Sequence, residues 1–319
     1  MVISIVLLVI GFFLLIKGAN WMVDGASALA KKFKISDLAI GLTIVAFGTS
    51  APELVVNSFA SINGHSDIVF GNIIGSNNFN LFAILGIVGL ISPIAVQSST
   101  VWKEIPISLF AALFVFFLCH NFFAEDTLQL GRIDGFLLLI CFGLFLFYVY
   151  QQMKKDIAPE SNDAPLFSTK KIWLLIGVGL AGLVIGGKLV VDAAVEIATQ
   201  IGVSEKVIGL TIVAAGTSLP ELVTSVVAAL KKNADIAIGN VIGSNIFNLL
   251  LILSISSFVS PIAYSAKFDT DFYVLIGGTI FLFAAMFTGK KKKLDRWEAA
   301  VLLLAFHFYT FYLLSGDAA

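Results

Sequence analysis

Two glutamates lie in near-identical segments of this 319-residue chain, each inside a long apolar run. Glu53 belongs to GLTIVAFGTSAPELV, and Glu221 holds the same place in GLTIVAAGTSLPELV. A carboxylate at the centre of a bilayer costs about 2.5 to 3.5 kcal/mol on insertion scales, and two that face each other also repel. Two such acids in one chain are therefore expected to be neutralised by a cation.

Each segment also carries a proline directly before its acid. Pro52 has no N–H for the carbonyl of Gly48, so a helix across this segment is predicted to open there and to restart with Thr49 or Ser50 as its cap. The break is expected to leave carbonyls near Ala46 without partners, which membrane proteins tolerate where those carbonyls line a cavity or bind something. The expected result is an oxygen-only cation site and its mirror image in the second copy, from Ala46, Thr49 and Glu53 and from Ala214, Thr217 and Glu221.

A second duplicated block, GNIIGSNNFN and GNVIGSNIFN, supplies more oxygen. Its glycines, four residues apart, predict close approach to a neighbouring helix. Its polar residues are spaced i, i+4, i+8 and form one stripe on each helix. Taken alone, such a stripe could also be hydrogen bonding between helices. The stripes are Asn72, Ser76 and Asn80 in the first copy and Asn240, Ser244 and Asn248 in the second.

The residue types and their charges indicate which cation. Oxygen ligands without nearby His or Cys favour Ca²⁺ or Na⁺ over zinc or copper. One Ca²⁺ or two Na⁺ would neutralise Glu53 and Glu221 together. Competition between these two loads for one pair of charges is the minimum chemistry of an exchanger.

The elements that must hold these residues are membrane helices. The chain is 58% hydrophobic and 13% charged, whereas a soluble domain has about 25% charged residues. We therefore expect an all-α integral membrane protein, since the alternating pattern of a β-barrel is absent. Ten apolar runs reach the length of about 20 residues needed to cross a bilayer. They are 2–27, 38–61, 67–91, 104–123, 132–152, 172–198, 206–230, 235–259, 271–288 and 296–315.

Lysines and arginines predict the orientation. If the helices alternate in direction, nearly all of these residues fall on one side, and only Arg132, Lys206 and Lys267 fall on the other. The positive-inside rule then places both termini outside the cytoplasm, in a multi-pass protein of the cell membrane. Five helices per half make the second half an inverted copy of the first. The predicted parts are a first repeat, 1–156, a cytoplasmic linker, 157–169, and a second repeat, 170–319. Lys188 and Asp192, four residues apart, are expected to pair.

At the paired G-T-S-x-P-E and G-S-N-x-F-N motifs, the sequence resembles the prokaryotic Na⁺/Ca²⁺ exchanger branch of the Ca²⁺/cation antiporter superfamily. The resemblance covers essentially the whole chain. It implies the sodium/calcium exchanger fold, with helices 2, 3, 7 and 8 as the ion-binding core and helices 1 and 6 sliding across it. It also implies transported Ca²⁺ and Na⁺, no cofactor and no obligatory protein partner.

The resemblance also implies a set of ligands. The family's central site falls on Glu53 and Glu221, flanked by Asn80 and Asn248. Some relatives carry Asp where this chain has Asn248, so the core holds two acids rather than three and the number of Na⁺ per cycle stays open. The carbonyl, hydroxyl and serine ligands fall on Ala46, Thr49 and Ser76 in one half and on Ala214, Thr217 and Ser244 in the other.

Other functions remain alternatives to Na⁺/Ca²⁺ exchange. Glu53 and Glu221 could carry protons in an H⁺/Ca²⁺ antiporter, although that branch usually shows a G-N-x-x-E core, and K⁺-dependent exchange stays open. A Ca²⁺ channel would also place acids at a pore. An intramembrane hydrolase would bury carboxylates, but the chain lacks a nucleophile–base pair, so no enzyme is predicted. The net charge of −1 gives no indication of nucleic-acid binding.

Overall fold

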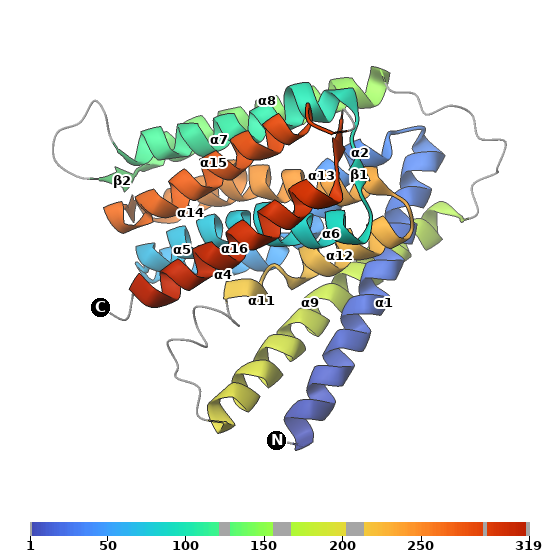
Figure 1. Ribbon diagram of the computed structural model, residues 1–319, viewed down its shortest axis with the longest axis horizontal. Helices are drawn as coiled ribbons and strands as arrows, with labels where there is room; N and C mark the ends of the chain where they lie inside the picture. The colour runs from blue at the N-terminus through green and yellow to red at the C-terminus, as the bar shows by residue number, and fades with distance from the viewer. Residues whose placement is uncertain (1, 121–127, 156–166, 202–213, 290–291, 317–319) are drawn as a thin grey trace.

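Helices make up most of the described chain (Figure 1). The structure is a computed structural model and describes residues 2–120, 128–155, 167–201, 214–289 and 292–316. Helices are the expected outcome for lipid-length apolar runs, because hydrocarbon offers no partner to an open backbone group. The first half contains α1 (Val2–Phe33), α2 (Asp37–Ile40), η1 (Gly41–Val45), α3 (Ala46–Thr49), α4 (Ala51–Ile62), α5 (Ser66–Asn78), η2 (Phe79–Ile84), α6 (Leu85–Ile91), β1 (Ile94–Ala95), η3 (Thr100–Glu104), α7 (Ile105–Cys119), β2 (Gln129–Leu130) and α8 (Arg132–Lys155). The second half contains α9 (Thr169–Gln200), α11 (Ala214–Gly216), α12 (Leu219–Leu230), α13 (Ala234–Ile246), η5 (Phe247–Ile252), α14 (Leu253–Val259), β3 (Ile262–Ala263), η6 (Ala266–Phe268), α15 (Asp269–Ala285), β4 (Lys293–Leu294) and α16 (Arg296–Gly316).

The predicted spans are found with shifts at their ends. Within the described residues, eight helices are long and apolar enough to cross a membrane, and a bent pair forms a ninth span. The predicted span 206–230 lies partly outside the described residues, and its second part is α12. The fourth span begins earlier than predicted, at Thr100 rather than at 104, because the π-helical turn η3 extends it backwards. Its last predicted residues, 121–123, lie outside the described residues. Most of the predicted linker, 157–169, also lies outside the described residues, and α9 begins at Thr169.

Two short strand pairs join the halves. β1 pairs with β4, and β2 pairs with β3, both antiparallel. In each pair, the strand that follows one repeat's third span meets the strand that precedes the other repeat's fifth span. The halves are therefore interlocked in a symmetric way.

The helices α1 and α9 lie side by side, and the N-terminal part of α1 and the C-terminal part of α9 extend below the rest of the bundle in Figure 1. Glycines let their backbones touch: a Cβ added at Gly18 would lie 2.7 Å from the Gly179 carbonyl oxygen, and one at Gly179 would lie 2.6 Å from the Met22 nitrogen. This close crossing, which the sequence motifs did not predict, makes the two long helices one unit.

Gly179→Ala is expected to destabilise the protein, whereas Gly177→Ala is not. No heavy atom of the described residues lies within 4 Å of a Cβ at Gly177. Overpacking at Gly179 should lower the free energy of unfolding by about 1–3 kcal/mol, whereas alanine at Gly177 should raise it by roughly 0.5–1 kcal/mol through helix propensity. Thermal unfolding in one detergent measures both. Equal melting temperatures for the two variants would contradict the close crossing.

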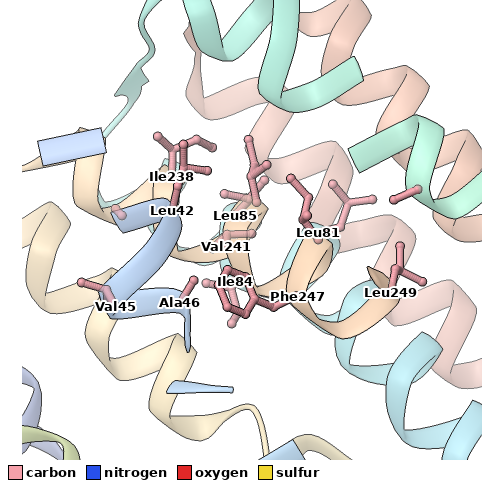
Figure 2. Close-up of a cluster of buried hydrophobic side chains, with 14 of the residues drawn as sticks. Leu42, Val45, Ala46, Leu81, Ile84, Leu85, Ile238, Val241, Phe247 and Leu249 are labelled. Carbon is pink, nitrogen blue, oxygen red and sulfur yellow. The ribbon is translucent and has the colours of Figure 1, made fainter. Parts of the chain in front are cut away.

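Apolar side chains from both repeats pack around the helix break. Figure 2 shows this cluster, in which residues of η1 and α3 meet residues of the η2–α6 and α13–η5 segments. Val45, Ala46, Ile84 and Ile246 are fully buried there. The broken segments are thus held in a rigid apolar frame that fixes the polar residues between them.

Candidate functional site

The predicted helix break is present in both repeats. α3 ends at Thr49, α4 begins at Ala51, and the two parts are bent by 48°. In the second repeat α11 ends at Gly216 and α12 begins at Leu219. A proline lies in the first turn of each new helix, as its missing N–H requires.

Two details of the predicted break are wrong. Ser50 occupies the cap position of α4, but its side chain forms no cap hydrogen bond, because φ −82° and ψ 7° differ from the extended conformation that capping needs. The Ala46 carbonyl is also not left without a partner, since it accepts the Ser50 N–H at 3.0 Å. The break lies where it was predicted, but the proline affects only the carbonyl four residues before it, which is that of Gly48.

The serines of the two breaks instead connect the repeats. Ser50 Oγ donates to Glu221 Oε1 at 3.0 Å, and Ser218 Oγ donates to Glu53 Oε1 at 3.4 Å. Each serine therefore bonds the acid of the opposite repeat. Both acids are buried, with 1% of Glu53 and 0% of Glu221 exposed. This exchange places the two carboxylates at the meeting point of the repeats.

The threonines of the two breaks make a second crossed pair. Thr49 Oγ1 donates to Asn240 Oδ1 at 3.0 Å, and Thr217 Oγ1 donates to Asn72 Oδ1 at 3.3 Å. The first residue of each polar stripe thus accepts a hydrogen bond from the threonine at the helix break of the other repeat. The predicted alternative, that the stripe serves hydrogen bonding between helices, is correct for Asn72 and Asn240.

Four asparagines form a symmetric cluster between α5–η2 and α13–η5. Asn77 and Asn245, 168 residues apart, each donate to the other's backbone carbonyl at 3.3 Å. Their side-chain carbonyls accept the amides of the stripe, so that Asn80 Nδ2 bonds Asn245 Oδ1 at 3.1 Å and Asn248 Nδ2 bonds Asn77 Oδ1 at 2.9 Å. Because the NH₂ groups of Asn80 and Asn248 are held in this way, their carbonyl oxygens face elsewhere.

Several oxygens of this region are buried without a hydrogen-bond partner among the described residues. Buried polar groups are normally paired, so a cluster of unpaired oxygens needs an explanation. Within the described chain no group of three or more His, Cys, Asp and Glu residues gathers, so any cation here would rest on two acids and neutral oxygens. The unpaired oxygens are Glu53 Oε2, Glu221 Oε2, Ser76 Oγ, Asn80 Oδ1 and Asn248 Oδ1.

The two repeats differ in how far their threonines are exposed. A Cβ added at Gly243 would lie 2.7 Å from the Ala46 Cβ, so the predicted close approach is correct for the second copy of the motif. The counterpart of this contact in the first copy, beside Gly75, lies outside the described residues. Thr49 is fully buried, but Thr217 is partly exposed. The site is therefore more tightly covered beside Thr49 than beside Thr217.

A groove of ≈ 440 Å³ reaches Thr217 between α4, α9 and α12. Val55 and Val56 of α4 form part of one wall, and Val191 of α9 forms part of the other. Lys188 and Asp192 also line it and pair at 3.2 Å, as predicted. The groove gives one face of the molecule a route to the break in the second repeat.

The sequence identified most of this arrangement but missed four residues. Ala46 and Ala214 lie just before the helix breaks, as predicted. Of Ala214 the structure describes only its position as the first residue of α11. Ser50, Ser218, Asn77 and Asn245 were not selected. They belong to the same duplicated motifs, so the repeat itself was the signal that could have found them.

Comparisons with known proteins find similar sequences over nearly the whole chain. Residues 3–151 and 171–315 match the family described as sodium/calcium exchanger protein. Sodium/calcium exchanger MaX1 of Methanosarcina acetivorans is 32% identical over 98% of this chain and 97% of that protein. Inner membrane protein YrbG of Escherichia coli is 32% identical over 86% of this chain and 87% of that protein.

A solved structure shares the fold. The sodium-calcium exchanger NCX_Mj, soaked with 2.5 mM Na⁺ and 10 mM Sr²⁺, superposes with a TM-score of 0.83 at 31% identity and covers 96% of this chain and 97% of that one. Two duplicated helix breaks, buried acids at their meeting point and these likenesses lead to one assignment. This chain belongs to the sodium/calcium exchanger protein family.

Proposed function

We propose that this protein exchanges Na⁺ for Ca²⁺ across the membrane by alternating access, with a central cation site between Glu53 and Glu221. The observation that carries the proposal is the pair of unpartnered carboxylate oxygens, Oε2 of each acid, buried at the crossing of the two repeats. A cation between them removes both the cost of an unpaired buried charge and the repulsion between the acids.

The surrounding oxygens complete the ligand set. Asn80 and Asn248 offer carbonyl oxygens that their NH₂ contacts leave available. Ca²⁺ takes six to eight oxygen ligands in flexible geometry, so two acids and several neutral oxygens suit it. The flanking Na⁺ positions are assigned to Ala46, Thr49 and Ser76 on one side and to Ala214, Thr217 and Ser244 on the other.

The asymmetry of the repeats indicates the direction of access. The groove reaches Thr217 from the half of the membrane that holds the C-terminal end of α9, which the lysine distribution predicts to be extracytoplasmic. The mirror route beside Thr49 is taken to be closed, because Thr49 is fully buried whereas Thr217 is partly exposed. The α1–α9 pair covers the route beside Thr49 and borders the route to Thr217. Sliding of this pair would therefore close the route to Thr217 and open the route beside Thr49. The repeats 1–156 and 170–319, and extracytoplasmic termini, are part of this proposal.

The test is Ca²⁺ uptake into proteoliposomes. Vesicles loaded with Na⁺ should take up radioactive Ca²⁺, whereas choline-loaded vesicles with an imposed pH gradient should not. Uptake driven by the pH gradient alone would transfer the protein to the H⁺/Ca²⁺ class. Uptake that needs no counter-ion would indicate a channel, and uptake from Na⁺-loaded vesicles only when K⁺ is added would indicate K⁺ dependence.

Asn77→Ala is expected to raise the KM for Ca²⁺ about tenfold, since residues that orient metal ligands typically account for 10- to 100-fold in affinity. It removes the acceptor that holds the Asn248 amide. Asn78→Ala is the matched control, because Asn78 is equally buried but bonds Asp271 and Tyr309 on another side of the helix. Initial rates of Na⁺-driven uptake measure both, and equal KM values for the two variants would contradict the positioning role.

A further inference from the structure

An apolar groove of ≈ 340 Å³ lies away from the proposed cation site, where four segments meet. It is lined by the end of α1, the turn from α2 to η1, the end of α8 and the start of α9. Figure 1 shows these segments coming together at the upper right of the molecule. Aromatic side chains mark its borders, and Phe33, Tyr150 and Trp173 are each more than half exposed.

The rim of this groove is basic. Lys154 and Lys171 are exposed, and among the described residues each ammonium lies over an aromatic ring rather than against a carboxylate: 4.4 Å from the Tyr150 ring and 4.1 Å from the Phe167 ring. Lys32 joins them from α1, because its Nζ lies 2.5 Å from Thr169 Oγ1 at the start of α9. Three cations therefore flank the groove, since Lys154 follows Met153 of its lining and Lys171 stands two residues before Trp173, among the aromatic residues that are typical of a membrane interface.

We infer that the groove binds an anionic phospholipid, with an acyl chain along the apolar lining and the phosphate among Lys32, Lys154 and Lys171. Charge and shape together argue for this occupant. An apolar slot alone fits any acyl chain, but a basic pocket between membrane helices favours anionic headgroups by about fivefold per lysine. The aromatic rings under Lys154 and Lys171 hold the two ammoniums at the rim, where a phosphate would meet them.

The inferred site has a structural consequence. Its walls combine α1 and α9 with α2, η1 and α8, so a bound lipid contacts both the long helix pair and the rest of the bundle. The inference stands on the groove and its lysines and is independent of the transported ions.

Brominated lipids test the inference, because bromine on an acyl chain quenches a tryptophan that it touches. The protein would be reconstituted in phosphatidylcholine that contains increasing fractions of brominated phosphatidylglycerol or brominated phosphatidylcholine. The signal is the fluorescence that wild type has and Trp173→Phe lacks. Half-quenching by the anionic lipid is expected at a mole fraction more than about tenfold lower than by the zwitterionic lipid.

Two charge-matched variants locate the site. Lys154→Gln with Lys171→Gln should reduce the preference to about fivefold, since two of the three headgroup contacts are lost and Lys32 remains. Lys231→Gln with Lys232→Gln removes the same charge from a different, polar groove and should leave the preference intact. Glycerol phosphate, which has the headgroup but no acyl chain, should not relieve the quenching. Equal quenching by both lipids, a preference that the first double variant leaves unchanged, or relief by glycerol phosphate would overturn the inference.

Discussion

Glu53→Gln is expected to abolish Na⁺-driven Ca²⁺ uptake while the protein stays folded. Glutamine keeps the size of the side chain and an oxygen to accept the Ser218 hydroxyl, so the packing is preserved. It removes one of the two charges that face the cation. Breaking a buried charge pair costs about 3–5 kcal/mol, which corresponds to a loss of roughly 10² to 4 × 10³ in affinity. Glu221→Gln should have the same effect, since its Oε1 accepts from Ser50 in the mirror arrangement.

Glu104→Gln is the matched control for this prediction. Glu104 is also fully buried, also has an unpartnered Oε2 within the described residues, and accepts a hydrogen bond from Tyr148. It lies in η3, outside the crossing of the repeats, and has no counterpart in the second half, where the matching position is Phe272. Transport should survive this substitution. If Glu53→Gln transports normally, or if Glu104→Gln is equally inactive, the central site is misplaced.

The sequence predicted the main features of this site because they follow from backbone chemistry. A proline in an apolar run forces a break, and a duplicated acid beside it must face its copy when the halves are inverted. The side-chain partners could not be predicted in this way. Ser50 has the residue type of a helix cap, but the hydroxyl bonds the acid of the other repeat, a choice that depends on how two distant segments meet.

The π-helical turns were also beyond sequence reasoning. η2 and η5 begin at Phe79 and Phe247, directly before Asn80 and Asn248 of the proposed central site. A π-helical turn contains one residue more than an α-helical turn, so the side chains that follow it point in a different direction. Such turns are frequent at functional sites. An i, i+4, i+8 count assumes a regular α-helix. It therefore places Asn80 and Asn248 on the same face as the rest of the stripe, but it cannot predict how far the π-helical turn rotates their side chains.

Mirror positions in α4 and α12 are expected to differ in their accessibility to a water-soluble reagent, because only the α4 position lies on the groove. Val56 lines the groove and is 37% exposed, whereas Thr224, its counterpart, is 0% exposed. In a background with Cys119→Ser and Cys141→Ser, Val56→Cys should react with a membrane-impermeant thiol reagent about 100-fold faster than Thr224→Cys, as for a conformational equilibrium near 99:1. The reagent should act from the side predicted to be extracytoplasmic.

Turnover should then reverse the contrast, because alternating access opens the mirror route. With Na⁺ and Ca²⁺ on opposite sides, Thr224→Cys should become reactive, and only toward reagent added from the side opposite to the one that modifies Val56→Cys. Adding Glu53→Gln should prevent this increase in the reactivity of Thr224→Cys, since a protein that cannot bind the transported cations cannot complete the transport cycle. Modification of both positions from the same side, or a Thr224→Cys variant that transports yet never reacts, would mean that the two repeats do not exchange roles.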